Sequence, residues 1–303
     1  MTDPNQTSKR PPVCDYEGSD YQTSFWEHGG RAYEDGAEAI ALKRLLPPGG
    51  KTMFEIGAGA GRNTPRYKNF ETIVLMDYST TQLQQAQERL GRSGKYIYVA
   101  ADVYHLPFNP GVFDAATMIR VLHHMAEPRQ ALAEIRKTLS PGAVFILEFA
   151  NKHNLKAIFR HLLGKQDWSP YSLEPVEYIP LNYDFHPRAV RKWLAEIGFK
   201  LNRQLTVSHF RIGLLKRLIP TKLLVGMDAI ASLTGDLWQL SPSVFTRSTA
   251  VGGSPMGDPG DGLFCCPECK ASLGEPVEDV LTCTCGFRWG IEDGIYNFKK
   301  PIG

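Results

Sequence analysis

Five short apolar runs, separated by segments with helical patterning, constrain the fold of this chain more than any other feature. The runs are residues 52–56, 72–76, 96–100, 113–119 and 143–149. They are almost continuously apolar, which is typical of parallel strands buried on both faces. Between them, apolar residues recur three or four positions apart, as at Leu83, Ala86 and Leu90. The sequence therefore predicts an α/β fold with a doubly wound parallel sheet, whose ligand crevice lies at the carboxyl ends of the strands.

Composition limits the number of domains and the classes of partner. With 303 residues, 43 % of them hydrophobic, the chain can form one full domain and a small second one. The formal charge of +2 removes any general electrostatic reason to bind nucleic acid or an acidic membrane. No apolar run is long enough to span a bilayer, and MTDPNQTSKRPP lacks the apolar core of a signal peptide. We expect a cytoplasmic protein without stable membrane insertion.

Local composition divides the chain into four parts. In order, we expect a flexible polar segment at 1–20, a main domain at 21–250, a Gly- and Pro-rich linker at 251–262 and a cysteine-rich module at 263–303. Within the main domain, residues 211–240 mix Lys and Arg with leucines around Pro220. Two interpretations of this stretch stay open: a helical cover with its basic side chains in solvent, or an amphipathic lid that admits a lipophilic substrate or touches lipid.

The first apolar run leads into alternating glycines at Gly57, Gly59 and Gly61. Glycines at this spacing let the backbone pass close beneath a ligand. Dinucleotide-binding folds carry G-x-G-x-x-G, but Arg62 occupies the third glycine position here. The turn therefore favours a ligand without phosphates. Glu55, under the turn, places negative charge where a cationic ligand could use it.

Acidic residues follow the next two strands, with Asp77 ending the second and Asp102 following the third. Because the carboxyl ends of parallel strands share one edge of a sheet, both carboxylates face the same crevice. The first can accept charge-assisted hydrogen bonds from ribose hydroxyls, and the second can accept one from an adenine amino group. One acid alone would be interpreted as a helix cap or a solvated loop residue. Three acids at three successive strand ends favour a ligand site.

The strings EIGAGAGRN, MDYS and ADVYHLPF, with the stretch 113–149, resemble the class I S-adenosylmethionine-dependent methyltransferases. The similarity covers about residues 50–150 and is greatest to the group that includes ubiquinone, menaquinone and tRNA wobble-uridine methyltransferases. It implies a Rossmann-like sheet of seven strands, the last of which, near 244–250, runs antiparallel. It also implies roles for individual residues: Gly57, Gly59 and Gly61 under the cofactor above Glu55, Asp77 and Tyr78 at the ribose, Asp102 and Val103 at the adenine, Arg120 near the methionine moiety, and Tyr33 in a covering segment 21–33.

Two histidines, His123 and His124, follow the fourth predicted strand. The N-P-P-Y tetrad that amine and amide methyltransferases carry at this place is absent, which disfavours a base amine or a glutamine side chain as acceptor. Methyl transfer depends mainly on in-line positioning, and a base is needed only when the acceptor must lose a proton. Either imidazole is a candidate catalytic base, since its pKa suits proton transfer near neutral pH. The alternative is that one of them packs against the helix that begins near Pro128.

The tail contains two close thiol pairs, which are Cys266 with Cys269 and Cys283 with Cys285. Four thiolates joined by a short hairpin suit structural zinc, which a module this small needs for folding. The second pair has C-x-C spacing where C-x-x-C is usual, and Cys265 adjoins Cys266. Cys265 therefore either replaces a ligand or is a buried spare thiol.

The tail also resembles the small zinc-ribbon activators of tRNA, rRNA and release-factor methyltransferases, through Cys-Pro-x-Cys, the second thiol pair and Asp293-Gly294-Ile295. That resemblance implies docking on the chain's own catalytic domain. The leading hypothesis is an S-adenosylmethionine-dependent methyltransferase whose acceptor is a small lipophilic metabolite, methylated on oxygen or carbon. The tail favours the alternative of an RNA or protein acceptor. A nicotinamide oxidoreductase is a further alternative, disfavoured by the glycine spacing and Asp102. A non-catalytic S-adenosylmethionine-binding module is another, disfavoured by the intact glycine loop and Arg120.

Overall fold

In the computed structural model of the protein, residues 11–19, 26, 30–253 and 262–302 are described. The strands of the main domain are β1 (Gly50–Ile56), β2 (Phe70–Asp77), β3 (Tyr96–Ala100), β4 (Phe113–Met118), β5 (Leu139–Ala150), β8 (Phe199–Val207), β9 (Ser243–Ala250) and a separate hairpin of β6 (Val176–Ile179) and β7 (Asn182–Asp184). Its α-helices are α1 (Ala32–Leu45), α2 (Thr80–Leu90), α3 (Pro128–Thr138), α4 (Leu155–Leu162), α5 (Pro187–Ile197), α6 (Gly213–Leu218) and α7 (Thr221–Ala231). Short 3-10 helices are η2 (Thr64–Tyr67), η3 (Val103–His105), η4 (Leu122–His124) and η5 (Ser232–Asp236).

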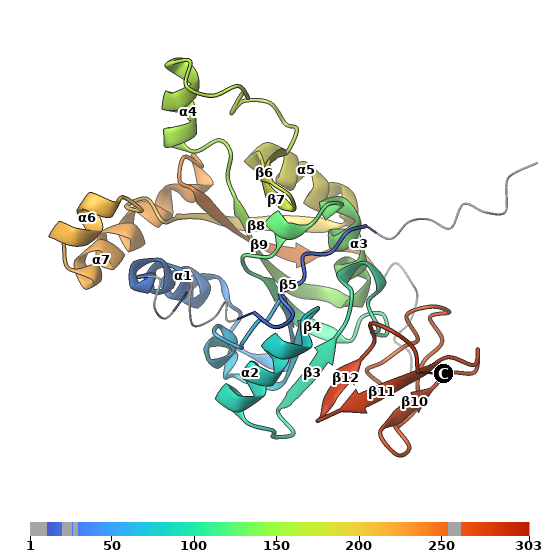
Figure 1. Ribbon diagram of the computed structural model, residues 1–303. Helices are drawn as coiled ribbons and strands as arrows, with labels where there is room; N and C mark the ends of the chain where they lie inside the picture. Colours follow the sequence, from blue (N-terminus) through green and yellow to red (C-terminus); the bar gives the residue numbers. More distant parts are fainter. Residues whose placement is uncertain (1–10, 20–25, 27–29, 254–261, 303) are drawn as a thin grey trace, which may run out of the picture.

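The seven main strands lie in the order β3-β2-β1-β4-β5-β9-β8. The first five of these are parallel, whereas β9 is antiparallel to both β5 and β8, as the resemblance implies for residues 244–250. The strand order reverses between β1 and β4, and ligand crevices form at such switch points. The carboxyl ends of β1, β2 and β4 therefore meet beside one another (Figure 1).

Different helices cover the two faces of the sheet because successive strand residues point to opposite faces. Met53 belongs to a core with Ala41 and Leu45 of α1 and with residues of α2. Its neighbour Phe54 belongs to the opposite core, to which α3 and α5 contribute. The apolar helical patterns of the sequence are thus the buried stripes of these four helices.

The C-terminal module extends the sheet to ten strands. It contributes β10 (Val280–Thr282), β11 (Arg288–Glu292) and β12 (Ile295–Asn297), and β12 pairs in parallel with β3. The backbone nitrogen of Phe298 continues this pairing by donating to the Ala100 oxygen at 2.8 Å. Phe264, Trp289 and Phe298 are buried in the same core as Phe54. The resemblance implied seven strands, and the three additional ones come from this module.

Candidate active site

A glycine turn follows β1 at the carboxyl edge of the sheet. Gly57, Gly59 and Gly61 have positive φ angles of 65°, 53° and 70°. A Cβ atom at Gly57 would lie 2.2 Å from a methyl carbon of Val121, and one at Gly61 would lie 2.8 Å from Leu90. These two glycines therefore let the turn pack closely against the loop after β4 and against α2.

Asp77, the last residue of β2, fixes this turn. Its Oδ2 accepts a hydrogen bond from the Gly59 nitrogen at 2.8 Å, and its Oδ1 accepts one from the Ser79 nitrogen at 2.9 Å. Burial raises the pKa of Asp77, although these backbone donors oppose the rise. The carboxylate thus joins the two loops that face the crevice.

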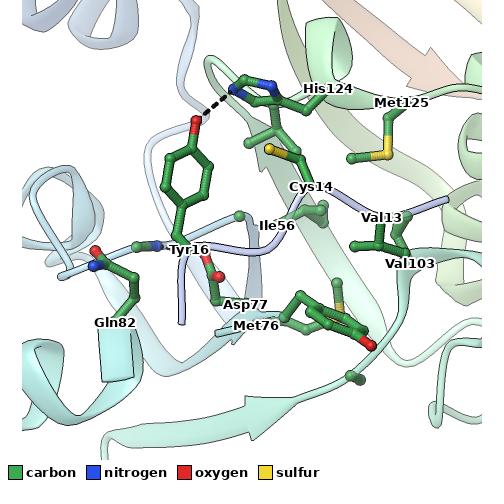
Figure 2. Close-up of a pocket in the computed structure, with 15 residues that line it drawn as sticks. Val13, Cys14, Tyr16, Ile56, Met76, Asp77, Gln82, Val103, His124 and Met125 are labelled. Carbon is green, nitrogen blue, oxygen red and sulfur yellow. Dashed lines mark hydrogen bonds between the residues drawn. The ribbon is translucent and has the colours of Figure 1, made fainter. Parts of the chain in front are cut away.

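A cavity of about 110 Å³ lies over the turn (Figure 2). Six of the residues that the sequence singles out line it: Gly57, Gly59, Asp77, Tyr78, Val103 and His124. Ile56 and Met76 supply apolar wall. Val13, Cys14 and Tyr16 also line it, and the sequence analysis missed these three because they belong to a polar segment without periodicity.

We call residues 11–19 the strap, because they pass across this cavity (Figure 2). The Glu17 carboxylate accepts hydrogen bonds from the backbone nitrogens of Thr80, at 2.9 Å, and Thr81, at 3.0 Å, which begin α2. The Lys299 ammonium of the C-terminal module lies 3.4 Å from Glu17. Of the expected covering segment 21–33, residues 21–25 and 27–29 lie outside the described part of the chain.

His124 holds the strap from the other side of the cavity. Its Nδ1 lies 3.0 Å from the Leu181 carbonyl oxygen, and its Nε2 lies 3.1 Å from the Tyr16 hydroxyl (Figure 2). Since a carbonyl can only accept, we assign the proton of the neutral ring to Nδ1, which makes Nε2 the acceptor from Tyr16. Burial lowers the pKa of His124 and so favours this neutral form.

A second cavity, of about 70 Å³, lies on the far side of the glycine turn and is lined by Trp26, Arg62 and Arg120. The Arg62 guanidinium lies 3.5 Å from the centre of the Trp26 ring. Both arginines bind Glu38, and Arg62 does so at 2.8 Å. Although burial opposes ionisation of Glu38, the charges of Arg120 and Arg62 lower its pKa. This buried carboxylate therefore positions both guanidinium groups.

A third cavity, of about 190 Å³, is lined by residues that include Arg120, His123, Glu148 and Arg211. The buried Nδ1 of His123 has no hydrogen-bond partner within the described residues. Burial, followed by the charges of nearby groups, lowers the pKa of His123 well below 6.5, so its ring is neutral at pH 7. Glu148 accepts from the Arg120 nitrogen at 2.8 Å and from Ser243 Oγ at 2.5 Å. A neutral imidazole can accept a proton, and the lowered pKa makes His123 a weaker base than a free imidazole.

A fourth and larger cavity, of about 570 Å³, adjoins the third, since Arg211 and Pro242 line both. Its other walls are largely apolar and come from α4, from the segment after β8 and from the residues around η5: Leu155, Phe159, Ile212, Trp238 and Leu240. The two cavities together lead from a charged interior region to an apolar one.

Four residues that the sequence assigns to the cofactor lie outside the walls of these cavities: Tyr33, Glu55, Gly61 and Asp102. The Thr64 hydroxyl donates to Glu55 at 2.6 Å. Asp102 caps η3. The Tyr33 hydroxyl donates to Asp228 at 3.1 Å, a partner distant in the sequence. These residues support the loops and helices around the crevice.

The C-terminal module brings four cysteine sulfurs within 4.8 Å of one another, those of Cys266, Cys269, Cys283 and Cys285. The Sγ atoms of Cys266 and Cys285 are 3.8 Å apart. Tetrahedral zinc with Zn–S bonds of about 2.3 Å would separate its thiolates by about 3.8 Å. Cys265 is not part of this cluster, because its buried thiol donates to the Phe108 oxygen at 3.1 Å. The cluster fits a structural zinc ion, and Cys265 is the spare thiol.

Residues 54–147 match the family model described as a methyltransferase domain. An O-methyltransferase, cnsE, from Penicillium expansum is 28 % identical over 147 residues, which are 45 % of this chain and 52 % of that protein. A demethylmenaquinone methyltransferase from Clavibacter sepedonicus is 27 % identical over 161 residues, 52 % of this chain and 57 % of its own length. The chain thus spans about half the length of these curated relatives.

Solved structures share the fold over a longer stretch. A chain from the Haloferax volcanii complex that contains the Trm112 methyltransferase activator superposes with a TM-score of 0.53 at 15 % identity, over 77 % of this chain and 95 % of that one. An S-adenosylmethionine-dependent methyltransferase from Mesorhizobium loti gives 0.52 at 18 % identity, over 72 % and 99 %. The protein therefore has the α/β Rossmann-like fold seen in S-adenosylmethionine-dependent methyltransferases, and its residues 54–147 match the methyltransferase-domain model.

The Glu55 carboxyl provides a pH test of the packing beneath the glycine turn. Burial raises its pKa from 4.5 to about 8, so the folded protein retains a proton that the unfolded chain loses. This group therefore stabilises the fold fully below pH 4.5, and its contribution falls by about 1.4 kcal/mol per pH unit as the pH rises toward 8. Glu55→Gln removes the ionisation. We expect the unfolding free energy of the variant, measured with urea, to increase relative to that of the wild type as the pH rises from 5 to about 8.

Glu71→Gln is the matched control, since Glu71 is an exposed carboxylate in β2. Its unfolding free energy should keep a constant difference from the wild type over the same pH range. A constant difference for Glu55→Gln as well would mean that Glu55 ionises normally in the folded protein.

Proposed function

We propose that the protein is an S-adenosylmethionine-dependent methyltransferase that methylates oxygen or carbon of a small lipophilic metabolite. The observation that carries this proposal is the row of adjoining cavities along the carboxyl edge of the sheet. The two cavities at the glycine turn suit the cofactor, and the two beyond Arg120 suit the acceptor. The curated relatives named above are an O-methyltransferase and a demethylmenaquinone methyltransferase, which agrees with a small acceptor.

The first two cavities contain the groups that this cofactor requires. Apolar walls from Ile56, Met76 and Val103 suit an adenine ring, and the Asp77 carboxylate can accept from ribose hydroxyls. Gly57 and Gly59 line both cavities, so a single ligand can extend beneath the turn toward Arg120. When bound, S-adenosylmethionine would supply an electrophilic methyl group. In this proposal Glu55, Gly61, Asp102 and Tyr33 act by supporting the site.

The third and fourth cavities suit an amphiphilic acceptor. The neutral imidazole of His123 would take the proton of an ionisable acceptor atom, and Arg211 would bind a polar group beside it. The fourth cavity would hold the apolar part of the acceptor. His124 would act as a positioning residue, because both of its ring nitrogens already have partners.

An RNA or protein acceptor is the alternative, which the resemblance of the C-terminal module to translation-linked activators favours. A non-catalytic module that only binds S-adenosylmethionine is a further alternative. Tritiated methyl groups from S-adenosylmethionine, supplied with the protein to a cell extract, should appear in the lipid or small-molecule fraction. Label in the RNA or protein fraction would support the alternative acceptor, and the absence of label from every fraction would support the non-catalytic module.

The first prediction from the proposed function concerns cofactor binding. S-adenosylmethionine and its demethylated product should bind the protein in calorimetry, whereas nicotinamide dinucleotides should not. Asp77→Ala should weaken that binding by about 1.5–3 kcal/mol, because charge-assisted hydrogen bonds are lost. Asp114→Ala is the matched control: Asp114 also accepts from two backbone nitrogens, at Lys51 and Thr52, but it lies near the opposite end of the strands. Equal affinity in the two variants would remove Asp77 from the site.

The second prediction separates the two histidines. His123→Gln should lower kcat about 100-fold or more while the cofactor affinity stays unchanged, because only the proton acceptor is lost. His124→Gln should lower the melting temperature and weaken cofactor binding, since the hydrogen bond between His124 and Tyr16 is lost. Tyr16→Phe removes the same hydrogen bond and should weaken cofactor binding to a similar extent. Full turnover and stability in both histidine variants would leave neither residue with a role.

The third prediction concerns the metal. The four clustered cysteines would hold one zinc ion per chain, and its binding would stabilise β12 on the edge of β3. Removal of zinc with a chelator, or deletion of 252–303, should lower the melting temperature by about 5 °C or more and promote aggregation. Cys269→Ser should lose zinc, whereas Cys265→Ser should retain it. A deletion variant as stable and active as the full chain would mean that the module does not stabilise the catalytic domain.

A further inference from the structure

Exposed hydrophobic side chains are concentrated in two segments of the molecule. Among the described residues, 17 of the 21 large hydrophobic side chains that are exposed lie within 155–179 or 212–238. Soluble monomers rarely expose large apolar patches unless these patches contact a partner. Figure 1 shows α4, α6 and α7 projecting at the end of the molecule away from β10–β12.

Helix α4 turns an apolar stripe to solvent. Leu155, Phe159, Leu162 and Leu163 follow helical spacing and are 48 %, 56 %, 68 % and 65 % exposed. Packing against the sheet therefore does not explain these residues, and Ala157 is the buried residue of the helix.

The second segment has the same character. Leu214 and Leu218 of α6 are exposed, and α6 contains no buried residue. Leu223 and Ile230 of α7 are exposed as well. Thus both segments place leucine-rich surfaces in water.

Part of each segment is basic, whereas residues 166–179 contain three Asp or Glu and residues 228–238 contain two. Residues 155–165 and 211–227 contain seven Lys or Arg and no Asp or Glu, although the net charge of the whole chain is only +2. Lys216 binds Glu34 at 3.0 Å, and Arg211 lies 3.7 Å from it. The other five form no ion pair with any described residue: Lys156, Arg160, Lys165, Arg217 and Lys222.

The fourth cavity joins the two segments. Leu155 and Phe159 of α4 form one part of its wall, and Ile212 and Trp238 form another. Phe159, Ile212 and Trp238 are themselves 56 %, 54 % and 57 % exposed, so the apolar cavity is continuous with the apolar surface. Any ligand that enters between these helices passes between basic and leucine-rich surfaces.

We propose that residues 155–165 and 211–238, together called the docking face, bind the surface of an anionic lipid bilayer. Leucine side chains beside unpaired lysines and arginines are the combination that binds membrane interfaces, where the apolar groups enter the headgroup region and the cations contact anionic lipids. No helix among the described residues combines the length and hydrophobicity that crossing a bilayer requires, so the contact is peripheral. The fourth cavity would then open toward the lipid. This last point rests on the proposed lipophilic acceptor, whereas the docking face stands on its own exposure and charge.

Vesicle sedimentation with the full chain tests the proposal. The protein should sediment with sucrose-loaded phosphatidylcholine vesicles that contain phosphatidylglycerol, and binding should weaken with added salt and without phosphatidylglycerol. Arg160→Gln with Arg217→Gln should lower the partition coefficient about tenfold or more. Leu162→Asp with Leu218→Asp should abolish binding. None of these four residues lines a cavity described above.

The control variant changes one exposed cation and one exposed apolar residue elsewhere, Lys200→Gln with Val277→Asp, and should bind vesicles as the wild type does. Cofactor affinity, measured by calorimetry, should be unchanged in all three variants. Absence of sedimentation, or sedimentation that survives both docking-face variants, would overturn the proposal. Formation of a dimer, or of a complex with single-stranded RNA, would also overturn the proposal if the docking-face variants disrupt it and the protein does not bind vesicles.

The same samples separate this proposal from the proposed function. Vesicle binding without methyl transfer to any lipid-soluble acceptor would support the docking face and contradict the acceptor class. Methyl transfer to a lipid-soluble acceptor without vesicle binding would do the reverse.

Discussion

The Asp77 carboxylate is the contact on which the geometry of the site depends. A turn with three left-handed glycines has little conformational preference of its own, because glycine adopts many backbone conformations with similar ease. Asp77 selects one of them by binding the Gly59 nitrogen, while its second oxygen holds the nitrogen of Ser79, where α2 begins. Val121 and Leu90 pack so closely on the turn that no side chain fits at positions 57 and 61. The first two cavities lie against this turn, at the edge where β1 and β2 both end.

Glu38 has a comparable role on the other side of the turn. It is buried in α1 and binds both Arg62, just after the turn, and Arg120, just after β4. Losing one partner of a buried ion pair typically costs about 3–5 kcal/mol, since the remaining charge stays desolvated. Glu38 therefore couples helix α1, the glycine turn and the loop after β4. In that loop, Arg120 has a positive φ of 59°. The same guanidinium borders both the proposed cofactor cavity and the proposed acceptor cavity.

Much of the fold between residues 50 and 150 could be predicted, because buried strands and amphipathic helices leave periodic patterns in the sequence. Gly57, Gly59 and Asp77 could be predicted for a similar reason, since strand ends in one sheet share an edge. The acceptor cavities could not, because Glu148, Arg211 and Pro242 come from separate elements and carry no common spacing. The strap was missed since its order depends on contacts with Thr80, His124 and Lys299 rather than on its own composition. Likewise, spacing alone could not decide whether Cys265 joins the thiol cluster, but its hydrogen bond to Phe108 does.

The pairing of β12 with β3 has a consequence for the synthesis of the chain. Strand β3 is made early and is complete at Ala100, but its outer edge finds its partner only when residues 295–297 have been made. Until then, the edge of β3 and the aromatic cluster around Phe108 lack the cover that Phe264 and Phe298 provide. An uncovered strand edge is a template for pairing with other chains. The outer edge of β3 therefore stays open while residues 101–294 are made, and it closes only when β12 pairs with it.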